Sequence, residues 1–338
     1  MSDPFHGLRS HMKTMKERMK ASGAALVVMK DNRVVEEWYD GFHHDRTGAR
    51  SIDASSRFNV YSVRVTYIAL AAAICIEEGS IRLQDPLNDY FPGVQGEATV
   101  QHLLTRCTGL KWTDGMAEVV APPGTVLEGK RPDLVAAVIQ KATGQTVREI
   151  LHERLINPMG WTHTGWMGAA AENLVCDVSP LGYPTIRLGA DDGTDRNLFV
   201  NARELADWGN LHVNAGMKDG KRILPEKVIR QVTTPVHRSG QPSFGYFWWL
   251  KEGQSRHPQD ELGATLQDGS FQIFGASGCA CLVIPEYRAV AVRLFNSLYE
   301  GYDYLADIRG FGDEVMKALH TVEQFNQERR LMSRGGNE

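Results

Sequence analysis

The chain has 338 residues, of which 42% are hydrophobic and 23% are charged, and its formal net charge at pH 7 is −4. This composition is typical of a soluble globular protein with a substantial core. The small net charge argues against a nucleic-acid or membrane partner. We see no apolar stretch of transmembrane length, and the basic amino terminus lacks the apolar core of a secretion signal.

The first segments predict a helix followed by a β-hairpin. Residues 11–20 are basic and carry three methionines at helical spacing, so we expect an amphipathic helix that packs on the body of the protein. Residues 24–29 and 34–39 have strand character, and the turn at Asp31 between them favours a hairpin.

From Ser62 to about residue 235, helical patterns and loops dominate. Apolar side chains recur at helical spacing from Val65 to Ile76, as on one buried face of a helix. Three further helices are expected, at residues 100–104, 134–143 and 202–211. The second of them ends at Gly144, because glycine is preferred where helices stop.

Strand character returns in the last third of the chain. Strands are expected at residues 244–249, 270–274, 279–284 and 289–295, and a closing helix at 305–331. Strands at both ends with helices between them predict a sheet built from distant segments. We therefore expect a sheet region (residues 1–58 and 240–338), a mainly helical region (59–239) and an active-site cleft between them.

The five cysteines are an odd number without metal-ligand spacing. Cys279 and Cys281 alternate along an expected strand, so both should point to one face as small buried hydrophobes. A reduced, cytoplasmic protein without metal or cofactor is the simplest interpretation. Its expected partner is a small-molecule substrate, and the oligomeric state is left open.

Residues 58–65 are the most informative segment for function. Ser62 stands where an apolar run turns into a helix, and Val65 follows it by three residues. A serine at a helix start followed three residues later by lysine is the nucleophile arrangement of serine β-lactamases and penicillin-binding proteins. The lysine amine can take the serine proton, whereas Val65 cannot.

Further segments occur in the order that this family has. They are the segment after the Ser62 helix (78–86), a helix with the loop that follows (100–110), a proline-glycine-threonine turn (123–125), a second helix (205–211) and an aromatic run (245–249). From about residue 20 to 298 the chain thus resembles the serine β-lactamase-related hydrolases, particularly the branch with class C β-lactamases, D-alanyl-D-alanine peptidases and esterases. The resemblance implies an α/β (α+β) fold: an antiparallel sheet flanked by terminal helices, plus an inserted mainly helical region.

Two other motifs of the family are altered. Where the family has tyrosine-x-asparagine, this chain has Gly129-Lys130-Arg131, and the lysine- or histidine-containing motif of a core strand corresponds to Ala276-Ser277-Gly278. Apart from Ser62, the side chains that would handle protons are therefore absent. General acid–base assistance, typically worth about 10²- to 10⁴-fold in rate, is expected to be lost or to come from another residue.

Several roles remain open for the substituted residues. Lys130 could supply the missing base, its pKa lowered by burial and by Arg131, or the pair could bind a carboxylate or phosphate. They could also form a solvated turn before a helix, with Asp133 near its N-terminus. Ser62 could be merely a helix N-cap, and Trp112 could line the cleft mouth or belong to the core.

The predicted site therefore has Ser62 and Lys130 as catalytic residues and Arg131, Trp112, Ala276, Ser277 and Gly278 as substrate-binding residues. Three functions fit it. We favour an enzyme that acts on a small anionic or carbonyl-bearing metabolite by chemistry diverged from acyl hydrolysis, as in biosynthetic tailoring. The alternatives are an esterase, amidase or acyltransferase that uses Ser62 with a substituted base, and a pseudoenzyme that binds a ligand without turnover.

Overall fold

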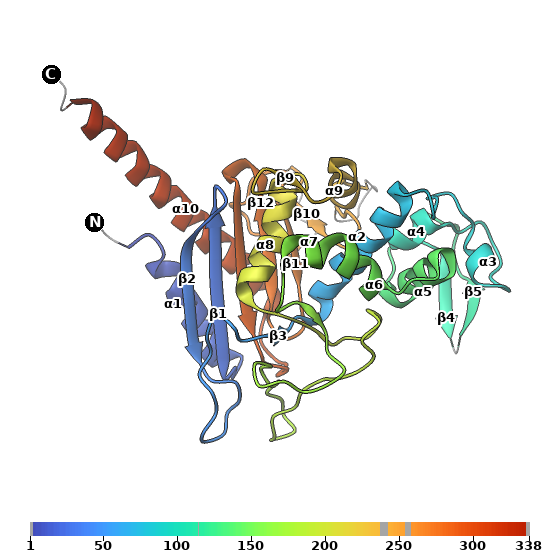
Figure 1. Cartoon of the computed structure of the whole chain (residues 1–338), viewed down its shortest axis with the longest axis horizontal. Helices are drawn as coiled ribbons and strands as arrows, with labels where there is room; N and C mark the ends of the chain where they lie inside the picture. The colour runs from blue at the N-terminus through green and yellow to red at the C-terminus, as the bar shows by residue number, and fades with distance from the viewer. Residues whose placement is uncertain (1–2, 114, 237–242, 254–257, 336–338) are drawn as a thin grey trace.

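The computed structural model describes residues 3–113, 115–236, 243–253 and 258–335. Within these ranges the centre of the molecule is an antiparallel sheet of six strands in the order β10-β11-β12-β13-β1-β2 (Figure 1). The strands are β1 (Gly23–Lys30), β2 (Arg33–Gly41), β10 (Trp249–Leu250), β11 (Phe271–Phe274), β12 (Ala280–Ile284) and β13 (Ala289–Phe295). The first and last strands of the sequence thus lie side by side.

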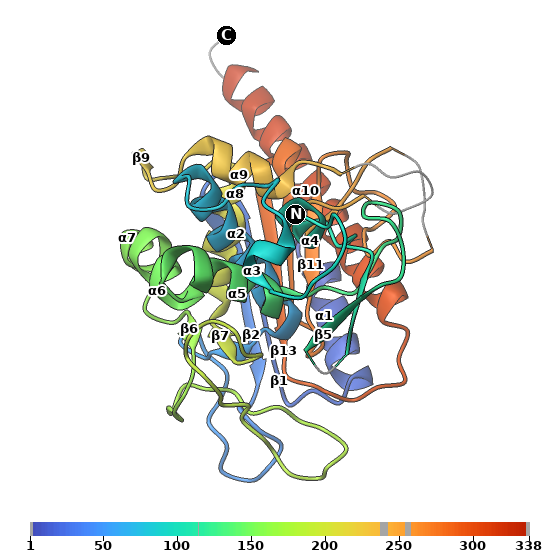
Figure 2. The same cartoon turned by 90° about the vertical axis from the view of Figure 1, so that its right-hand side faces the viewer.

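Both faces of the sheet are covered by helices. The terminal helices α1 (His6–Arg18) and α10 (Tyr304–Gly335) pack together on one face, and α8 (Ala202–Val213) lies on the other (Figure 1). Because side chains alternate along a strand, Val27 belongs to the core on the α8 side and Val28 to the core on the α1 side. The part of α10 nearest the C-terminus extends beyond the body of the protein in both views (Figure 2).

The helical region lies beside the α8 face. Its helices are α2 (Arg64–Glu77), α3 (Leu87–Tyr90), α4 (Val100–Leu104), α5 (Pro132–Thr143), α6 (Val147–Leu151), α7 (Asn157–Met159) and α9 (Glu226–Thr233), with a π-helical turn η2 (His152–Ile156) and a 3₁₀ turn η1 (Tyr61–Val63). A second 3₁₀ turn, η3 (Pro285–Tyr287), connects β12 to β13 in the sheet. Short strands form the pairs β4 (Leu110–Thr113) with β5 (Met116–Val119), β8 (Met217–Lys218) with β9 (Lys221–Arg222), and the set β3 (Phe58–Asn59), β7 (Leu198–Val200) and β6 (Gly165–Trp166).

Helix α2 is buried all round rather than on one face. Every residue from Arg64 to Cys75 is buried, which corrects the expectation of a single buried stripe. Tyr67 of α2 stacks on Trp208 of α8, with ring centroids 4.0 Å apart. Helix α2 therefore lies between the sheet layer and the other helices, and a completely buried helix is apolar on all sides.

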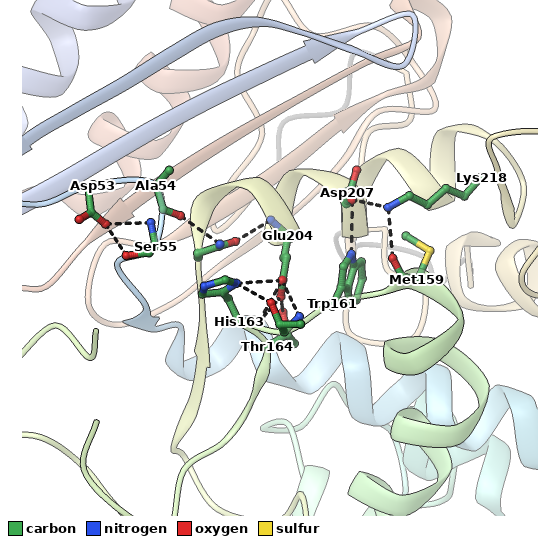
Figure 3. A network of polar contacts seen from close by, with 12 residues as sticks. Asp53, Ala54, Ser55, Met159, Trp161, His163, Thr164, Glu204, Asp207 and Lys218 are labelled. Carbon is green, nitrogen blue, oxygen red and sulfur yellow. Dashed lines mark hydrogen bonds and ion pairs between the residues drawn. The ribbon is translucent and has the colours of Figure 1, made fainter. Parts of the chain in front are cut away.

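Polar contacts fasten α8 to the segment that precedes β6 (Figure 3). The Glu204 carboxylate accepts hydrogen bonds from the backbone N–H groups of Thr162 (2.8 Å) and His163 (2.9 Å) and from the Thr164 hydroxyl (2.6 Å). One turn later, Asp207 pairs with Lys218 at 2.7 Å. Buried polar groups need such partners, so the network holds the helical region against the helix that covers the sheet.

Most of the predicted elements are confirmed, and one strand is not. The hairpin, the helices and the three strands that end at Phe295 form as expected, and Gly144 ends α5 in the left-handed conformation with φ of 73°. In the predicted strand 244–249, the ladder begins only at Trp249. Phe247 has φ of 68°, and a backbone in that conformation cannot continue an extended strand.

All five cysteines are free thiols, and Cys279 and Cys281 are buried in the same cluster, as predicted. In the described ranges of the chain, no helix combines the length and the apolar character that are needed to cross a membrane.

Candidate active site

Ser62 lies at a strained junction between a strand and a helix. Strand β3 ends at Asn59, Ser62 is the middle residue of η1, and α2 begins at Arg64. Tyr61 has φ of +45°, a region that bulky residues rarely adopt and that concentrates at functional sites. Neither η1 nor α2 has a side-chain N-cap hydrogen bond, so the interpretation of Ser62 as a simple helix cap is wrong.

The Ser62 hydroxyl has no general base from its own helix. Ser62 is half-buried, and no residue in the described part of the chain hydrogen-bonds with its Oγ. Val65 is only 2% exposed and packs in the core. Arg64, also buried, donates from Nε to the Asp195 carbonyl oxygen at 2.9 Å. Its pKa, lowered by burial to about 10, keeps this guanidinium protonated at neutral pH, so it cannot accept the serine proton.

The turn between β11 and β12 reaches the backbone of Ser62. A Cβ on Gly275 would collide with the Val60 carbonyl oxygen and would lie 3.5 Å from the Ser62 nitrogen. The turn is closed by a hydrogen bond from the Gly278 N–H to the Gly275 carbonyl oxygen (2.9 Å). Ala276, at its tip, is exposed. The structure therefore brings Ala276 and Ser62 close together.

Ala276, Ser277 and Gly278 lie in this turn because β11 ends at Phe274. This agrees with the predicted strand bounds, whereas the corresponding motif of the family lies on a core strand. Ser277 is fully buried and donates from Oγ to the Asn59 carbonyl oxygen at 2.9 Å. Gly278 is packed against Met19. Ser277 and Gly278 thus hold the turn in place, and Ala276 is the member of the motif that faces solvent.

A buried ion pair supports the turn from behind. Arg293 of β13 is fully buried and donates from Nε to the Gly278 carbonyl oxygen at 3.1 Å. Its two terminal nitrogens bind both oxygens of Asp307 at 2.7 and 2.5 Å. The arginine holds the pKa of the Asp307 carboxyl at about 2, in spite of burial. The Arg293 guanidinium also lies 5.1 Å from the centre of the Phe311 ring.

Arg131 and Trp112 contact each other at the start of α5. The Arg131 guanidinium lies 5.4 Å from the Trp112 ring centroid and pairs with Asp133 at 2.6 Å. Helix α5 begins at Pro132, with Asp133 in its first turn. These contacts agree with the interpretation in which Arg131 belongs to a partly solvated turn before a helix. Trp112 is half-buried and packs edge-on against Phe91.

Lys130 has different surroundings. Burial lowers the pKa of its ammonium, the Arg106 cation lowers it further, and the Glu261 carboxylate opposes both. The cation beside Lys130 is therefore Arg106 and not Arg131, which corrects the expected cause. Burial raises the pKa of Glu261. In the described part of the chain, Lys130 Nζ forms no hydrogen bond, so none joins it to Ser62.

A buried pair beside Ser62 was not predicted. The Tyr61 hydroxyl donates to Asp177 Oδ2 at 2.6 Å, and Asp177 is 2% exposed. Burial raises the pKa of Asp177 to about 7, although the Tyr61 hydrogen bond and the Arg187 charge lower it. Asp177 lies in a loop far from Ser62 in sequence. The one signal that could have indicated the pair was a tyrosine immediately before the serine.

Comparisons with known proteins agree with this architecture. A family model described as Beta-lactamase matches residues 9–310. The chain is 34% identical over 332 residues to an uncharacterized protein of Alkalihalophilus pseudofirmus (strain ATCC BAA-2126 / JCM 17055 / OF4), a match that covers 94% of this chain and 98% of that protein.

Two solved structures have a similar fold. One is EstCE1, a hydrolase with promiscuous acyltransferase activity (TM-score 0.75, 17% identity, 92% of this chain and 98% of that chain). The other is a mutant of a class C β-lactamase (TM-score 0.77, 13% identity, 94% of this chain and 97% of that chain). Because the family model spans most of the sequence and the sheet, terminal helices and helical region match this fold, the chain belongs to the beta-lactamase family, among the serine β-lactamases and penicillin-binding proteins.

Proposed function

We propose that this protein is an enzyme that binds a small anionic or carbonyl-bearing metabolite at Ser62 and acts on it by chemistry diverged from plain acyl hydrolysis. A tailoring step of cytoplasmic biosynthesis is the type of reaction we favour. One observation supports the proposal: Ser62 lies at a strained junction between a strand and a helix, while the described residues offer its hydroxyl no hydrogen-bonded base.

The strain at Tyr61 supports a site that is still in use. A non-glycine residue in the left-handed region costs on the order of 1–3 kcal/mol and persists only where the surrounding structure imposes it. Here the Tyr61 N–H donates to Asn59 Oδ1 at 3.1 Å, and its hydroxyl binds Asp177. A serine that served only to start a helix would not need this conformation.

The backbone around Ser62 favours a substrate with a carbonyl group. In the described part of the chain, the N–H groups of Ser62 and Ala276 donate to no other residue, and the two residues adjoin the contact between Gly275 and Val60. Free amides in this position can stabilise the negative charge that develops on a carbonyl oxygen. One such donor is typically worth about 10²- to 10³-fold in rate.

Lys130 is the proposed base, because burial lowers the pKa of its ammonium toward neutrality. The alternative, in which Lys130 and Arg131 together bind an anion, is weakened by the pairing of Arg131 with Asp133. A Lys130→Met variant separates the roles. If Lys130 serves Ser62 as a base, any turnover of a chromogenic ester should fall in the variant without a change in KM and should lose its rise with pH. An increase in KM at unchanged kcat would contradict a base.

The second candidate function is an esterase or acyltransferase that uses Ser62, and the half-buried, uncommitted hydroxyl of Ser62 favours it. A fluorophosphonate probe separates the candidates. Fast labelling of the wild type that disappears in Ser62→Ala supports the esterase. Slow labelling together with stabilisation by small carboxylates supports the favoured proposal. Ligand stabilisation without labelling or turnover would leave a binding protein without catalysis.

A further inference from the structure

Two exposed arginines lie near the Ser62 turn, since the Arg187 charge acts on Tyr61 and the charges of both Arg187 and Arg196 act on Arg64. Arg187 and Arg196 lie in the long loop that connects β6 to β7, and both are exposed. In the described part of the chain, neither guanidinium forms a hydrogen bond or an ion pair. An exposed arginine gains little from an ion pair on the protein surface, and a guanidinium without one can bind the oxygens of a carboxylate or phosphate ligand.

The backbone of the loop fixes both residues close to the Ser62 turn. Arg196 is anchored by its carbonyl oxygen, which accepts a hydrogen bond from Asn59 Nδ2 at 2.9 Å, three residues before Ser62. The loop around Arg187 is anchored by the backbone pair of Asp177 with Thr185, at 2.7 and 3.0 Å. Asp177 in turn accepts the Tyr61 hydroxyl hydrogen bond.

A third, buried cation lies behind the two exposed ones. Arg64 is 6% exposed, and both Arg187 and Arg196 lie within its electrostatic range. Its Nε and Nη1 donate to the carbonyl oxygens of Asp195 (2.9 Å) and Tyr61 (3.5 Å). Arg64 therefore ties the loop to the Ser62 turn through main-chain acceptors, not through a hydrogen-bonded carboxylate.

The carboxylates near the three arginines each have another contact. Asp177 lies within range of Arg187, but it is buried and accepts the Tyr61 hydroxyl hydrogen bond. Asp133 and Asp195 both lie within range of Arg64. Asp133 is paired with Arg131 at 2.6 Å, and Asp195 Oδ2 accepts the Ala190 N–H at 2.9 Å. Like charges that are held together repel one another unless an anion lies between them. The exposed guanidinium groups of Arg187 and Arg196 are thus available to a ligand.

We propose that Arg187 and Arg196 bind the anionic group of the substrate, a carboxylate or a phosphate, while Arg64 positions their loop against Ser62. This inference rests on the proposed function and moves the anion site away from Lys130 and Arg131. A guanidinium offers two parallel N–H donors to such oxygens. Held this close to the Ser62 turn, the anionic group would bring the rest of the substrate to the serine.

The test is to titrate the full-length protein with inorganic phosphate and with succinate by calorimetry, at constant ionic strength against chloride. We expect the double variant Arg187→Gln/Arg196→Gln to bind the preferred anion about tenfold more weakly or worse. The matched control is Arg33→Gln, an exposed arginine of β2, which should bind as the wild type does. The anion that binds more tightly shows whether the anionic group of the substrate is a phosphate or a carboxylate.

The inference would be overturned if the double variant bound both phosphate and succinate as tightly as the wild type does. It would also be overturned if the wild type bound neither anion more tightly than chloride. Ser62→Ala should retain anion binding, because the arginines do not need the hydroxyl. Loss of anion binding in the double variant supports the site even if no ester is turned over, in which case only the enzymatic proposal fails. Turnover that is lost in Ser62→Ala but unchanged in the double variant would support the enzymatic proposal and contradict the anion site.

Discussion

The arginine behind the Ser62 turn and the arginines in front of it differ in every contact. Arg293 is fully buried, binds both oxygens of Asp307 and donates to the Gly278 carbonyl oxygen. Arg187 and Arg196 are exposed, and in the described ranges their side chains have no hydrogen-bond or ion-pair partner. A buried charge must be paired within the folded protein, whereas an exposed charge is solvated by water and can remain unpaired until a ligand binds. The comparison therefore separates the arginine that supports the turn from the two arginines that we propose bind the substrate.

The largest effect should come from breaking the buried pair. In Asp307→Ala, the Arg293 guanidinium is left buried without a carboxylate, which typically costs about 3–5 kcal/mol. Urea denaturation measures the free energy of unfolding. Asp133→Ala is the control, because it breaks an exposed pair worth no more than about 1 kcal/mol. Equal losses in the two variants would contradict the structural role of Arg293.

A smaller effect is expected at the contact between the turn and Ser62. Gly275→Ala places a Cβ against the Val60 carbonyl oxygen, and such overpacking costs about 1–3 kcal/mol. Because the strained backbone at Ser62 must shift, fluorophosphonate labelling should slow as well. Gly129→Ala is the matched control, since a Cβ there meets nothing within 4 Å. Labelling at the wild-type rate in Gly275→Ala would show that the turn does not position Ser62.

The pH dependence of stability sharpens the comparison at Asp177. Its pKa is raised from 3.8 to about 7, mainly by burial, so the folded state prefers the protonated carboxyl. The contribution to stability is complete below about pH 4 and is lost as the pH rises through 7. Asp177→Asn has no such carboxyl. Between pH 4 and 8, the wild type should lose more stability than the variant, by about 1 kcal/mol or more.

Thermal or urea unfolding of both proteins at several pH values provides this measurement. Parallel stability curves for the wild type and Asp177→Asn would mean that Asp177 is ionised across the range. Arg293 and Asp307 should behave in the opposite way. The Asp307 pKa of about 2 lies below its usual 3.8, so that contribution is present above about pH 4 and is lost as the pH falls through 2.

Local patterns predicted the secondary structure well where a single interaction decided it. The turn at Asp31 and the helix stop at Gly144 follow from residues that tolerate positive φ. The prediction of a strand over the aromatic residues before Trp249 was wrong. At Phe247 the strand propensity is overridden by a turn that depends on tertiary packing. Ser277 and Gly278 were expected to line the site, but they hold its turn from inside.

By itself, the sequence determined the strand and helix order, the family and the presence of valine three residues after Ser62, because these depend on residue type and near neighbours in the chain. The tertiary structure alone decided which distant residues lie near the Ser62 turn and which lie near Lys130. Arg187 and Arg196 come from a loop with no motif, and the charges beside Lys130 belong to Arg106 and Glu261. Burial and pairing depend on how layers pack in space, and residue spacing does not encode such contacts.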